Sequence, residues 1–166
     1  MRIIKLLLIS IVAFGLLLSI FSLFIPAGFS VIKSVSVPVT PDKVAPYLED
    51  LREWNNWNLL AGGEAPVSGT VSSNELKTGR FNVTKQESEV NQVVTIWTDG
   101  KRSLNSIMDY GPAPDDENST MIQWYMHIQT KWYPWEKFAS MIFDKQLDKP
   151  MESSLDSLKS LILKNH

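Results

Sequence analysis

The sequence predicts an α+β domain in which a C-terminal amphipathic helix covers one face of an antiparallel sheet, preceded by one N-terminal transmembrane helix. Three observations carry this prediction. The chain opens with a long uncharged apolar run, continues with short stretches of alternating apolar and polar residues, and ends with apolar residues at helical spacing. The part after residue 28 has the usual size of one domain, so one core is expected.

The apolar run at residues 6–25 contains no charged residue. As a helix rising about 1.5 Å per residue it would reach about 30 Å, the thickness of a hydrocarbon core. A cleaved signal peptide is the alternative. Its apolar core would be shorter, roughly 7 to 15 residues, and the residues that end this run fit a cleavage site poorly. We therefore favour an uncleaved anchor.

Charges flanking the run predict its orientation. Arg2 and Lys5 precede it, and Lys33 is the first charge after it, so the positive-inside rule places the N-terminus in the cytoplasm. We expect a single-pass membrane protein, with an anchor and tether at residues 1–28 and an extracytoplasmic domain at residues 29–166. That domain would be periplasmic in a Gram-negative cell.

The first elements of the domain follow from local patterns. Residues 29–38 alternate apolar and polar side chains, which predicts a half-buried strand with Lys33 as the exception. A helix should begin at residues 40–42, where threonine, proline and aspartate supply an N-cap, a proline in the first turn and an acid. Trp54 and Trp57 are three residues apart and could share one face of a short second helix.

A series of strands should follow, and we expect them at about residues 69–74, 79–87, 91–98, 101–110 and 119–130. Asp99-Gly100 supplies the positive φ of a tight turn, so the third and fourth of these strands should be antiparallel neighbours. Residues 111–118 read as a polar loop. The last strand alternates strictly, which gives the sheet a large apolar face.

Two C-terminal helices are predicted rather than one. Pro150 would remove a hydrogen bond from a helix interior, so we expect a short helix at about residues 135–143 and a second one beginning at Pro150. The stripe of the second helix consists of Met151, Leu155, Leu158 and Ile162.

Composition excludes several classes of function. The chain has 16 basic and 18 acidic residues, and the basic ones form no cluster in the sequence. This argues against a nucleic-acid partner. The absence of cysteine excludes disulfides and thiolate chemistry, and with two histidines a metal site is not expected. No catalytic or phosphate-binding motif is present, so catalytic residues stay unknown, and no cofactor is expected.

Four segments resemble one family: FSVIKSVSVPVTPDKVAPYL at the start of the domain, the D-x-x-x-W-x-x-W pattern from Asp50 to Trp57, KWYPWEKF, and the final SLDSLKSLI. Together they are similar to the START-like or SRPBCC superfamily, of the polyketide cyclase/dehydrase and lipid-transfer type, in its membrane-anchored bacterial form. The resemblance covers about residues 29–163. It implies a helix-grip fold, a curved sheet of six or seven strands around the C-terminal helix, and a cavity between them for an apolar or amphipathic molecule. It implies no common catalytic set.

Our first hypothesis is a binding domain for a lipid-like small molecule. The side chains expected to line its pocket are apolar or aromatic and face the C-terminal helix: Trp54, Trp57, Phe81, Leu104, Met108, Tyr110, Trp124, Met126, Met151 and Leu155. The tryptophans among them could equally be ordinary core residues.

Two alternatives stay open. A cyclase or hydrolase could use Tyr110 or His127 as acid or base, although strand parity places His127 on the outer face. A non-catalytic envelope module could instead bind a protein through Trp132, Tyr133 and Trp135, a patch that could also touch lipid headgroups. The sequence identifies no protein partner.

Overall fold

The computed structural model describes residues 2–24, 28–62, 71–100, 103–129 and 133–165, with side chains omitted for residues 138–145. Its elements follow one another as an apolar helix, a strand, three short helices, five strands and a long helix. They are α1 (Arg2–Leu23), β1 (Gly28–Val37), α2 (Pro41–Glu49), the 3-10 helix η1 (Glu53–Asn56), α3 (Leu59–Gly62), β2 (Glu75–Lys77), β3 (Asn82–Lys85), β4 (Gln92–Thr98), β5 (Ser103–Ala113), β6 (Asp116–Gln129) and α4 (Pro134–Asn165).

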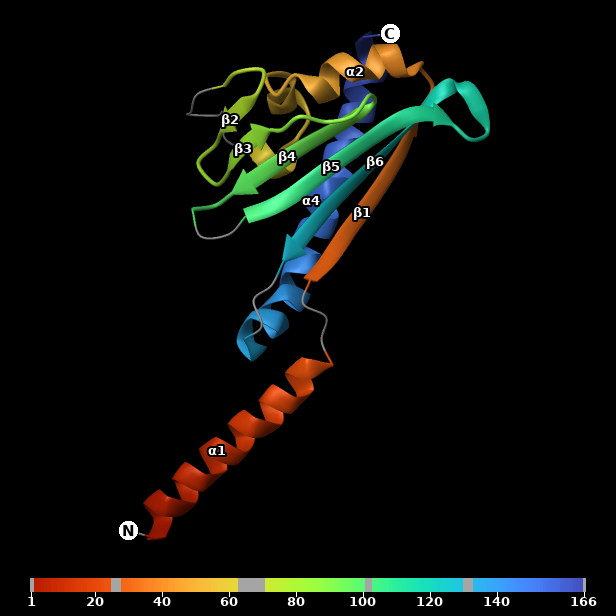
Figure 1. Ribbon diagram of the computed structural model, residues 1–166. Coiled ribbons are helices and arrows are strands. Elements are labelled where there is room, and N and C mark those ends of the chain that lie inside the picture. Colours follow the sequence, from red (N-terminus) through yellow and green to blue (C-terminus); the bar gives the residue numbers. More distant parts are fainter. Residues whose placement is uncertain (1, 25–27, 63–70, 101–102, 130–132, 166) are drawn as a thin grey trace.

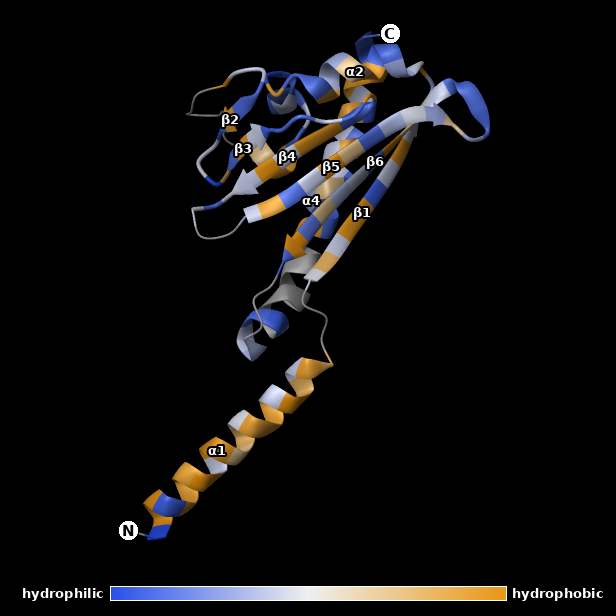
Figure 2. Ribbon diagram, viewed as in Figure 1, coloured by the Kyte–Doolittle hydropathy of each residue, from blue (hydrophilic) through white to orange (hydrophobic). Residues whose placement is uncertain are grey.

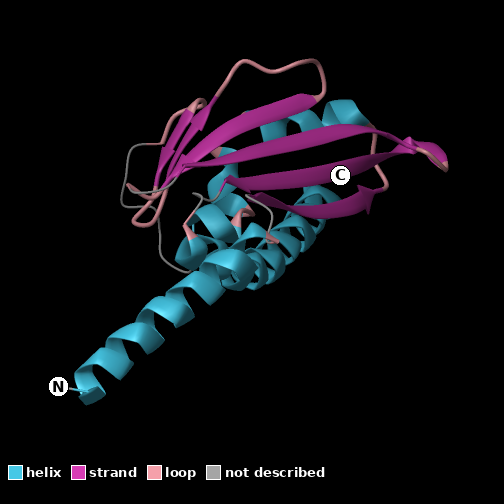
Figure 3. Cartoon of the chain, turned by 60° about the horizontal axis from the view of Figure 1, so that its bottom comes forward, coloured by secondary structure: helices cyan, strands magenta, loops and turns pink. Residues whose placement is uncertain are grey.

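The strands form one six-stranded antiparallel sheet in the order β1-β6-β5-β4-β3-β2. The sheet curves, and α4 runs along one of its faces while the other carries no helix (Figures 1 and 3). This arrangement confirms the predicted α+β class and helix-grip fold. Because β1 lies next to β6, the opening strand of the domain pairs with its last strand. β1 therefore forms one edge of the sheet and β2 forms the other.

Alternation along the strands decides which face is covered. In β4 every second residue is buried, and β6 behaves in the same way over most of its length. The colouring of Figure 2 shows this as a change between hydrophobic and hydrophilic residues along the strands. The buried set meets the apolar stripe of α4 and forms one continuous core.

The apolar run forms α1, which extends away from the domain (Figure 1). By length and composition alone, this one helix near the N-terminus could cross a membrane. Its large side chains are exposed along almost its whole length, so the domain itself does not cover them. Figure 2 shows that most of this helix is hydrophobic.

The predicted break at Pro150 is wrong, because α4 is continuous from Pro134 to Asn165. Leu147 is buried one turn before Met151, so continuing the helix through Pro150 buries both on the same face. Proline leaves the carbonyl of Gln146 without its helical donor, and Gln146 is exposed, so water can solvate that carbonyl.

The prediction of a loop at residues 111–118 is also wrong, because the connection in the structure is much shorter. β5 continues to Ala113 and β6 begins at Asp116, with a register irregularity between Pro112 and Ala113. Pairing to β6 holds these residues in the ladder despite their turn-forming composition, and Gly111 pairs with Met121.

Two further strands differ from their predicted positions. The strand expected at residues 69–74 lies partly outside the described residues, and its described part contains only a bridge between Val71 and Leu76. There the Ser72 hydroxyl accepts the backbone N–H of Glu75 in a local turn, which competes with strand pairing. Likewise Thr78 accepts the N–H of Phe81, so β3 begins only at Asn82.

Other local predictions are confirmed. β4 and β5 are antiparallel neighbours, and Gly100 between them has φ of +84°, a left-handed conformation that glycine adopts without strain. The helix α2 begins at Pro41 as expected, with Thr40 at the N-cap position, although the Thr40 side chain makes no capping hydrogen bond. Trp54 lies in η1, the short helix expected around the two tryptophans, and Trp57 is its C-cap.

Candidate functional site

The segment after α2 carries two tryptophans back over the end of that helix. Asp50 begins the turn, where its carboxylate accepts the N–H of Arg52 at 2.9 Å. The indole N–H of Trp54 then donates to the Leu48 carbonyl at 2.8 Å, and that of Trp57 to the Tyr47 carbonyl at 3.0 Å. Carbonyls in the last turn of a helix lack intrahelical donors, so both indoles satisfy them while their rings enter the core. This geometry explains the D-x-x-x-W-x-x-W pattern.

Four tryptophans meet under α4, and all four are fully buried. The ring centroids of Trp54 and Trp57 are 5.5 Å apart, those of Trp57 and Trp124 6.3 Å, and those of Trp97 and Trp124 6.2 Å. Phe81 extends the group, with its ring 5.5 Å from that of Trp97. We call these five residues the aromatic cluster. Offset and edge contacts of this kind stabilise the group beyond simple burial.

Every indole N–H of the aromatic cluster is satisfied within the protein. Besides the two that bond to α2, Trp97 donates to the Thr95 hydroxyl at 3.0 Å and Trp124 to the Ser106 hydroxyl at 2.7 Å. Thr95 and Ser106 are cross-strand neighbours on β4 and β5, and both are fully buried. The polar atoms of the cluster therefore bond to backbone or strand hydroxyls, and only ring surface is left for further contacts.

The structure brings together the side chains that the sequence predicts as a pocket. Nearly all belong to one buried core, Leu104 packs against that core half-buried, and Met151 and Leu155 approach from α4. Their lining of a ligand cavity stays a prediction, because here they contact one another as a core does. The predicted pocket left out Trp97, although its parity with Val93 on β4 was a signal in the sequence; in the structure it pairs with Leu104.

Polar contacts on two sides attach the middle of α4 to the rest of the domain. On the β1 side, Lys33 faces the helix and its Nζ lies 2.8 Å from the Asp148 carboxylate and 3.3 Å from that of Glu152. Hydrogen bonding to Asp148 is the main reason why the pKa of Lys33 is raised above its ordinary value. This contact explains why Lys33 breaks the apolar pattern of β1.

On the other side, the buried Ser154 joins α4 to α3. Its hydroxyl oxygen accepts the N–H groups of Leu59 at 3.0 Å and Leu60 at 3.4 Å, while its proton goes to the Pro150 carbonyl at 2.6 Å. Asn58 accepts the next N–H, that of Ala61, through Oδ1. The first three N–H groups of α3 are thus capped, two of them by α4.

Asn58 also has an unsatisfied group. The residue is 2% exposed, and its Nδ2 has no hydrogen-bond acceptor within the described part of the chain. The N–H of Ala61 fixes which end of the amide is the oxygen, so the orphan atom is the donor. A buried donor without an acceptor is costly and could serve a ligand that brings an oxygen. No pattern in the sequence points to this residue.

Tyr110 and His127 were the candidates for acid–base chemistry. Tyr110 is buried on β5 and its hydroxyl donates to the carboxylate of Glu49 on α2. Burial, and then the hydrogen bond to Glu49, raise the pKa of Tyr110 above its ordinary value, so the phenol keeps its proton. His127 lies on the outer face, as predicted, where its Nδ1 is 2.9 Å from the Ser30 hydroxyl.

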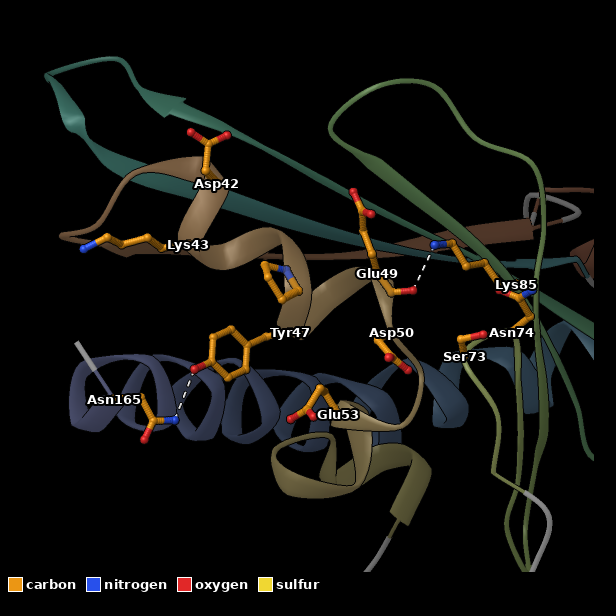
Figure 4. Close-up of a pocket in the computed structure, with 11 residues that line it drawn as sticks. Asp42, Lys43, Tyr47, Glu49, Asp50, Glu53, Ser73, Asn74, Lys85 and Asn165 are labelled. Atoms are coloured by element: carbon orange, nitrogen blue, oxygen red, sulfur yellow. Dashed lines mark hydrogen bonds between the residues drawn. The ribbon is translucent and has the colours of Figure 1, made fainter.

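An open groove of about 820 Å³ lies beside α2, at the end of the domain opposite α1 (Figures 1 and 4). Lys85 reaches across it to donate to the Glu49 carbonyl at 2.9 Å, and Asn165 donates to the Tyr47 hydroxyl at 3.1 Å. Hydrogen bonding to Arg52 lowers the pKa of Asp50. The groove is mostly polar and charged, with Asp42, Lys43, Pro46, Tyr47, Glu49, Asp50, Glu53, Ser73, Asn74, Lys85 and Asn165 around it. Among the residues that the structure describes, no group of acidic and histidine side chains could hold a metal ion.

The proposed aromatic patch lies where α4 begins, although its Trp132 falls outside the described residues. The rings of Tyr133 and Trp135 are stacked, with centroids 5.0 Å apart and planes within 2°. Trp135 is 68% exposed. On the following turn Lys137 is buried and donates to the Ser22 carbonyl of α1 at 2.8 Å. The start of α4 is therefore attached to the end of α1.

Solved structures share this fold at low identity. A START superfamily protein from Mycobacterium smegmatis is 15% identical, with a TM-score of 0.59 over 82% of this chain and 99% of that one. CalU16 from Micromonospora echinospora is 14% identical, with a TM-score of 0.58 over 83% and 80%. A protein from Thermus thermophilus is 14% identical, with a TM-score of 0.59 over 82% and 99%.

No curated protein sequence matches the chain significantly. A family model does match it over residues 29–162, which is most of its length, and that model describes polyketide cyclase/dehydrase and lipid transport proteins. The likeness to solved structures agrees with this match in fold, and the sheet and α4 supply the helix-grip arrangement. The chain therefore belongs to the polyketide cyclase/dehydrase and lipid transport family.

Proposed function

We propose that this protein is a membrane-anchored domain that binds an apolar or amphipathic, lipid-like small molecule between its sheet and α4. The observation that carries the proposal is the aromatic cluster, whose indole N–H groups all bond within the protein. Ring faces without free polar atoms favour apolar ligands, because a polar ligand would lose its hydration there and gain no hydrogen bond.

A ligand would have to separate α4 from the sheet or from α3 to reach these rings. Besides the apolar core between α4 and the sheet, polar contacts on two sides of the helix resist this separation: Lys33 with two carboxylates on one side and Ser154 with α3 on the other. Lys33 is partly exposed, and its ion pairs contribute only about 0–1 kcal/mol in such settings. We therefore infer that the ion pairs on the β1 side hold α4 less firmly than the hydrogen bonds on the α3 side do.

The unpaired Nδ2 of Asn58 supports an amphipathic ligand over a purely apolar one. A ligand carbonyl, carboxylate or hydroxyl oxygen could accept from this amide and remove the cost of a buried orphan donor. The position of Asn58 next to Trp57 in the chain would put that polar end beside the aromatic cluster.

The placement of the acid–base candidates supports binding over chemistry. The Tyr110 proton is held by Glu49, and the raised pKa of the phenol works against its use as a base near neutral pH. His127 is on the sheet face opposite the aromatic cluster. A polyketide cyclase-type reaction would need other groups than these two.

We further propose that α1 stays uncleaved, crosses the membrane and holds the domain on the extracytoplasmic side. The length and exposure of its apolar side chains support the span, and Arg2 and Lys5 support the orientation. Protease added outside intact spheroplasts should then degrade the domain. Full protection of the domain would overturn the orientation.

A direct test of binding uses the full chain in nanodiscs made from one synthetic lipid. After exchange out of detergent, solvent extraction and mass spectrometry should find a small molecule distinct from the disc lipid, close to one per chain. The control is a chain of residues 1–28 in identical discs, which reports anything bound to α1 alone. If the full chain carries nothing beyond that control, and also binds no added apolar dye beyond it, the binding proposal fails.

A further inference from the structure

The junction between α1 and α4 has a defined depth if α1 spans a bilayer, a premise taken from the proposed function. Residues 6–23 of α1 would rise about 27 Å at 1.5 Å per residue, close to the roughly 30 Å hydrocarbon thickness. Leu23, which ends this stretch, and Phe24, which follows it, are 80% and 83% exposed, so apolar surface continues to the last turn. The outer boundary of the hydrocarbon then falls near Ser22.

Lys137 fixes the start of α4 at this boundary. Its Nζ donates to the Ser22 carbonyl at 2.8 Å, and the two residues are only 8% and 3% exposed. A carbonyl in the last turn of a helix lacks an intrahelical donor, and in a membrane such a group is costly unless another group satisfies it. A lysine at that end also complements the negative pole of the helix dipole.

Trp135 is two residues before Lys137 and therefore lies within one turn of the same depth. It is 68% exposed and stacks on Tyr133 with a centroid distance of 5.0 Å. Tryptophan and tyrosine concentrate at membrane–water boundaries, where the ring contacts acyl chains and the polar atom reaches water and headgroups. A pair of stacked rings at this height, beside a lysine, has the chemistry of such a boundary.

We propose that the first turn of α4, residues 133–137, sits in the headgroup region of the bilayer that α1 crosses, with Trp135 as its anchor. The occupant of this surface is lipid because Lys137 joins this turn to Ser22, next to the exposed Leu23 and Phe24 at the end of the apolar α1. Since α4 also covers the aromatic cluster, one helix would connect the membrane surface to the proposed binding face (Figure 1).

The test exploits the absence of cysteine, which allows a single thiol to be placed anywhere in the full chain. Nitroxide labels on Trp135→Cys, Leu8→Cys and Val90→Cys would be compared in nanodiscs by their collision rates with oxygen, which partitions into lipid, and with a water-soluble nickel chelate. Val90 is the matched control, because it is 91% exposed and belongs to the segment between β3 and β4 at the α2 end of the domain.

The expected ratio of oxygen to nickel collisions is highest at position 8, intermediate at 135 and lowest at 90, with a several-fold difference between 135 and 90. Equal ratios at 135 and 90, with a high ratio at 8, would overturn the placement of residues 133–137 in the headgroup region but would leave the membrane span of α1 in place. A low ratio at position 8 would overturn both. Low access of both reagents at 135 would overturn the lipid contact, because protein, such as a second copy, would then cover the patch. As a second measurement, Trp135→Phe should reduce quenching of tryptophan fluorescence by brominated lipid, and unchanged quenching would overturn the lipid contact.

Discussion

The face of the sheet beneath α4 and the groove beside α2 are opposite kinds of surface. The first consists of rings whose polar atoms are satisfied inside the protein, and it is filled by its own side chains. The second is open, about 820 Å³, and lined by carboxylates, lysines and amides that face water (Figure 4). Volume alone would favour the groove as a ligand site. The buried face suits the apolar ligand that we propose better, because its indole N–H groups already have hydrogen-bond acceptors within the protein.

The largest effect should come from truncating the aromatic cluster. Trp124→Ala removes a fully buried ring and leaves the Ser106 hydroxyl without its indole donor, so we expect a loss of about 3–5 kcal/mol in the free energy of unfolding. Chemical denaturation of the full chain measures it. The groove control, Glu53→Ala, should stay within about 0.5 kcal/mol. A small loss in Trp124→Ala would show that the interior is already loose enough to admit a ligand.

An intermediate effect should follow from Ser154→Ala. The N–H groups of Leu59 and Leu60 would lose their acceptor in a buried position, which should cost about 1–3 kcal/mol. Amide exchange at these two residues should accelerate as α3 detaches from α4. Ser153→Ala is the matched control, since Ser153 is exposed on the same helix. Unchanged exchange in Ser154→Ala would mean that apolar packing alone holds α3.

Tyr110→Phe should lower the free energy of unfolding at neutral pH by less than Ser154→Ala does, and its effect should depend on pH. Loss of the hydrogen bond to Glu49 should destabilise the fold by about 0.5–1.5 kcal/mol. Because the folded-state pKa of Tyr110 is raised, its contribution is complete below pH 10.0, the ordinary value, and declines as the pH rises above it. The stability difference between wild type and Tyr110→Phe should therefore shrink in alkali. Tyr125→Phe on the outer face is the control, and a difference independent of pH would contradict the assignment.

The smallest effect is expected for Lys33→Met. Its ion pairs to Asp148 and Glu152 are partly exposed, so their loss should cost about 0–1 kcal/mol and less at high salt. The raised pKa of Lys33 means that this contribution is present below pH 10.5 and is lost above it. Lys43→Met in the groove serves as the comparison. A loss well above 1 kcal/mol would show that the β1 side is held as firmly as the α3 side.

Much of the fold could be predicted from the sequence because its signals are local. The alternation of β6, the turn at Gly100 and the start of α2 at Pro41 depend on contacts within a few residues. Most residues of the candidate site could be predicted for the same reason, since strand parity decides which side chains share a face. Asn58 was missed, because an orphan amide exists only once separate segments meet, whereas the strand parity of Trp97 was a signal that the predicted pocket left unused.

The sequence by itself determined an apolar helix long enough to span a membrane, a sheet with one apolar face and an amphipathic helix to cover it. Tertiary structure alone decided three things. α4 continues through Pro150 because Leu147 and Met151 gain burial on the same face. Lys33 turns inward because α4 presents two carboxylates to it. The rings under α4 expose no free N–H because α2 and the neighbouring strands supply every acceptor, and side-chain hydrogen bonds of this kind leave no periodic trace in a sequence.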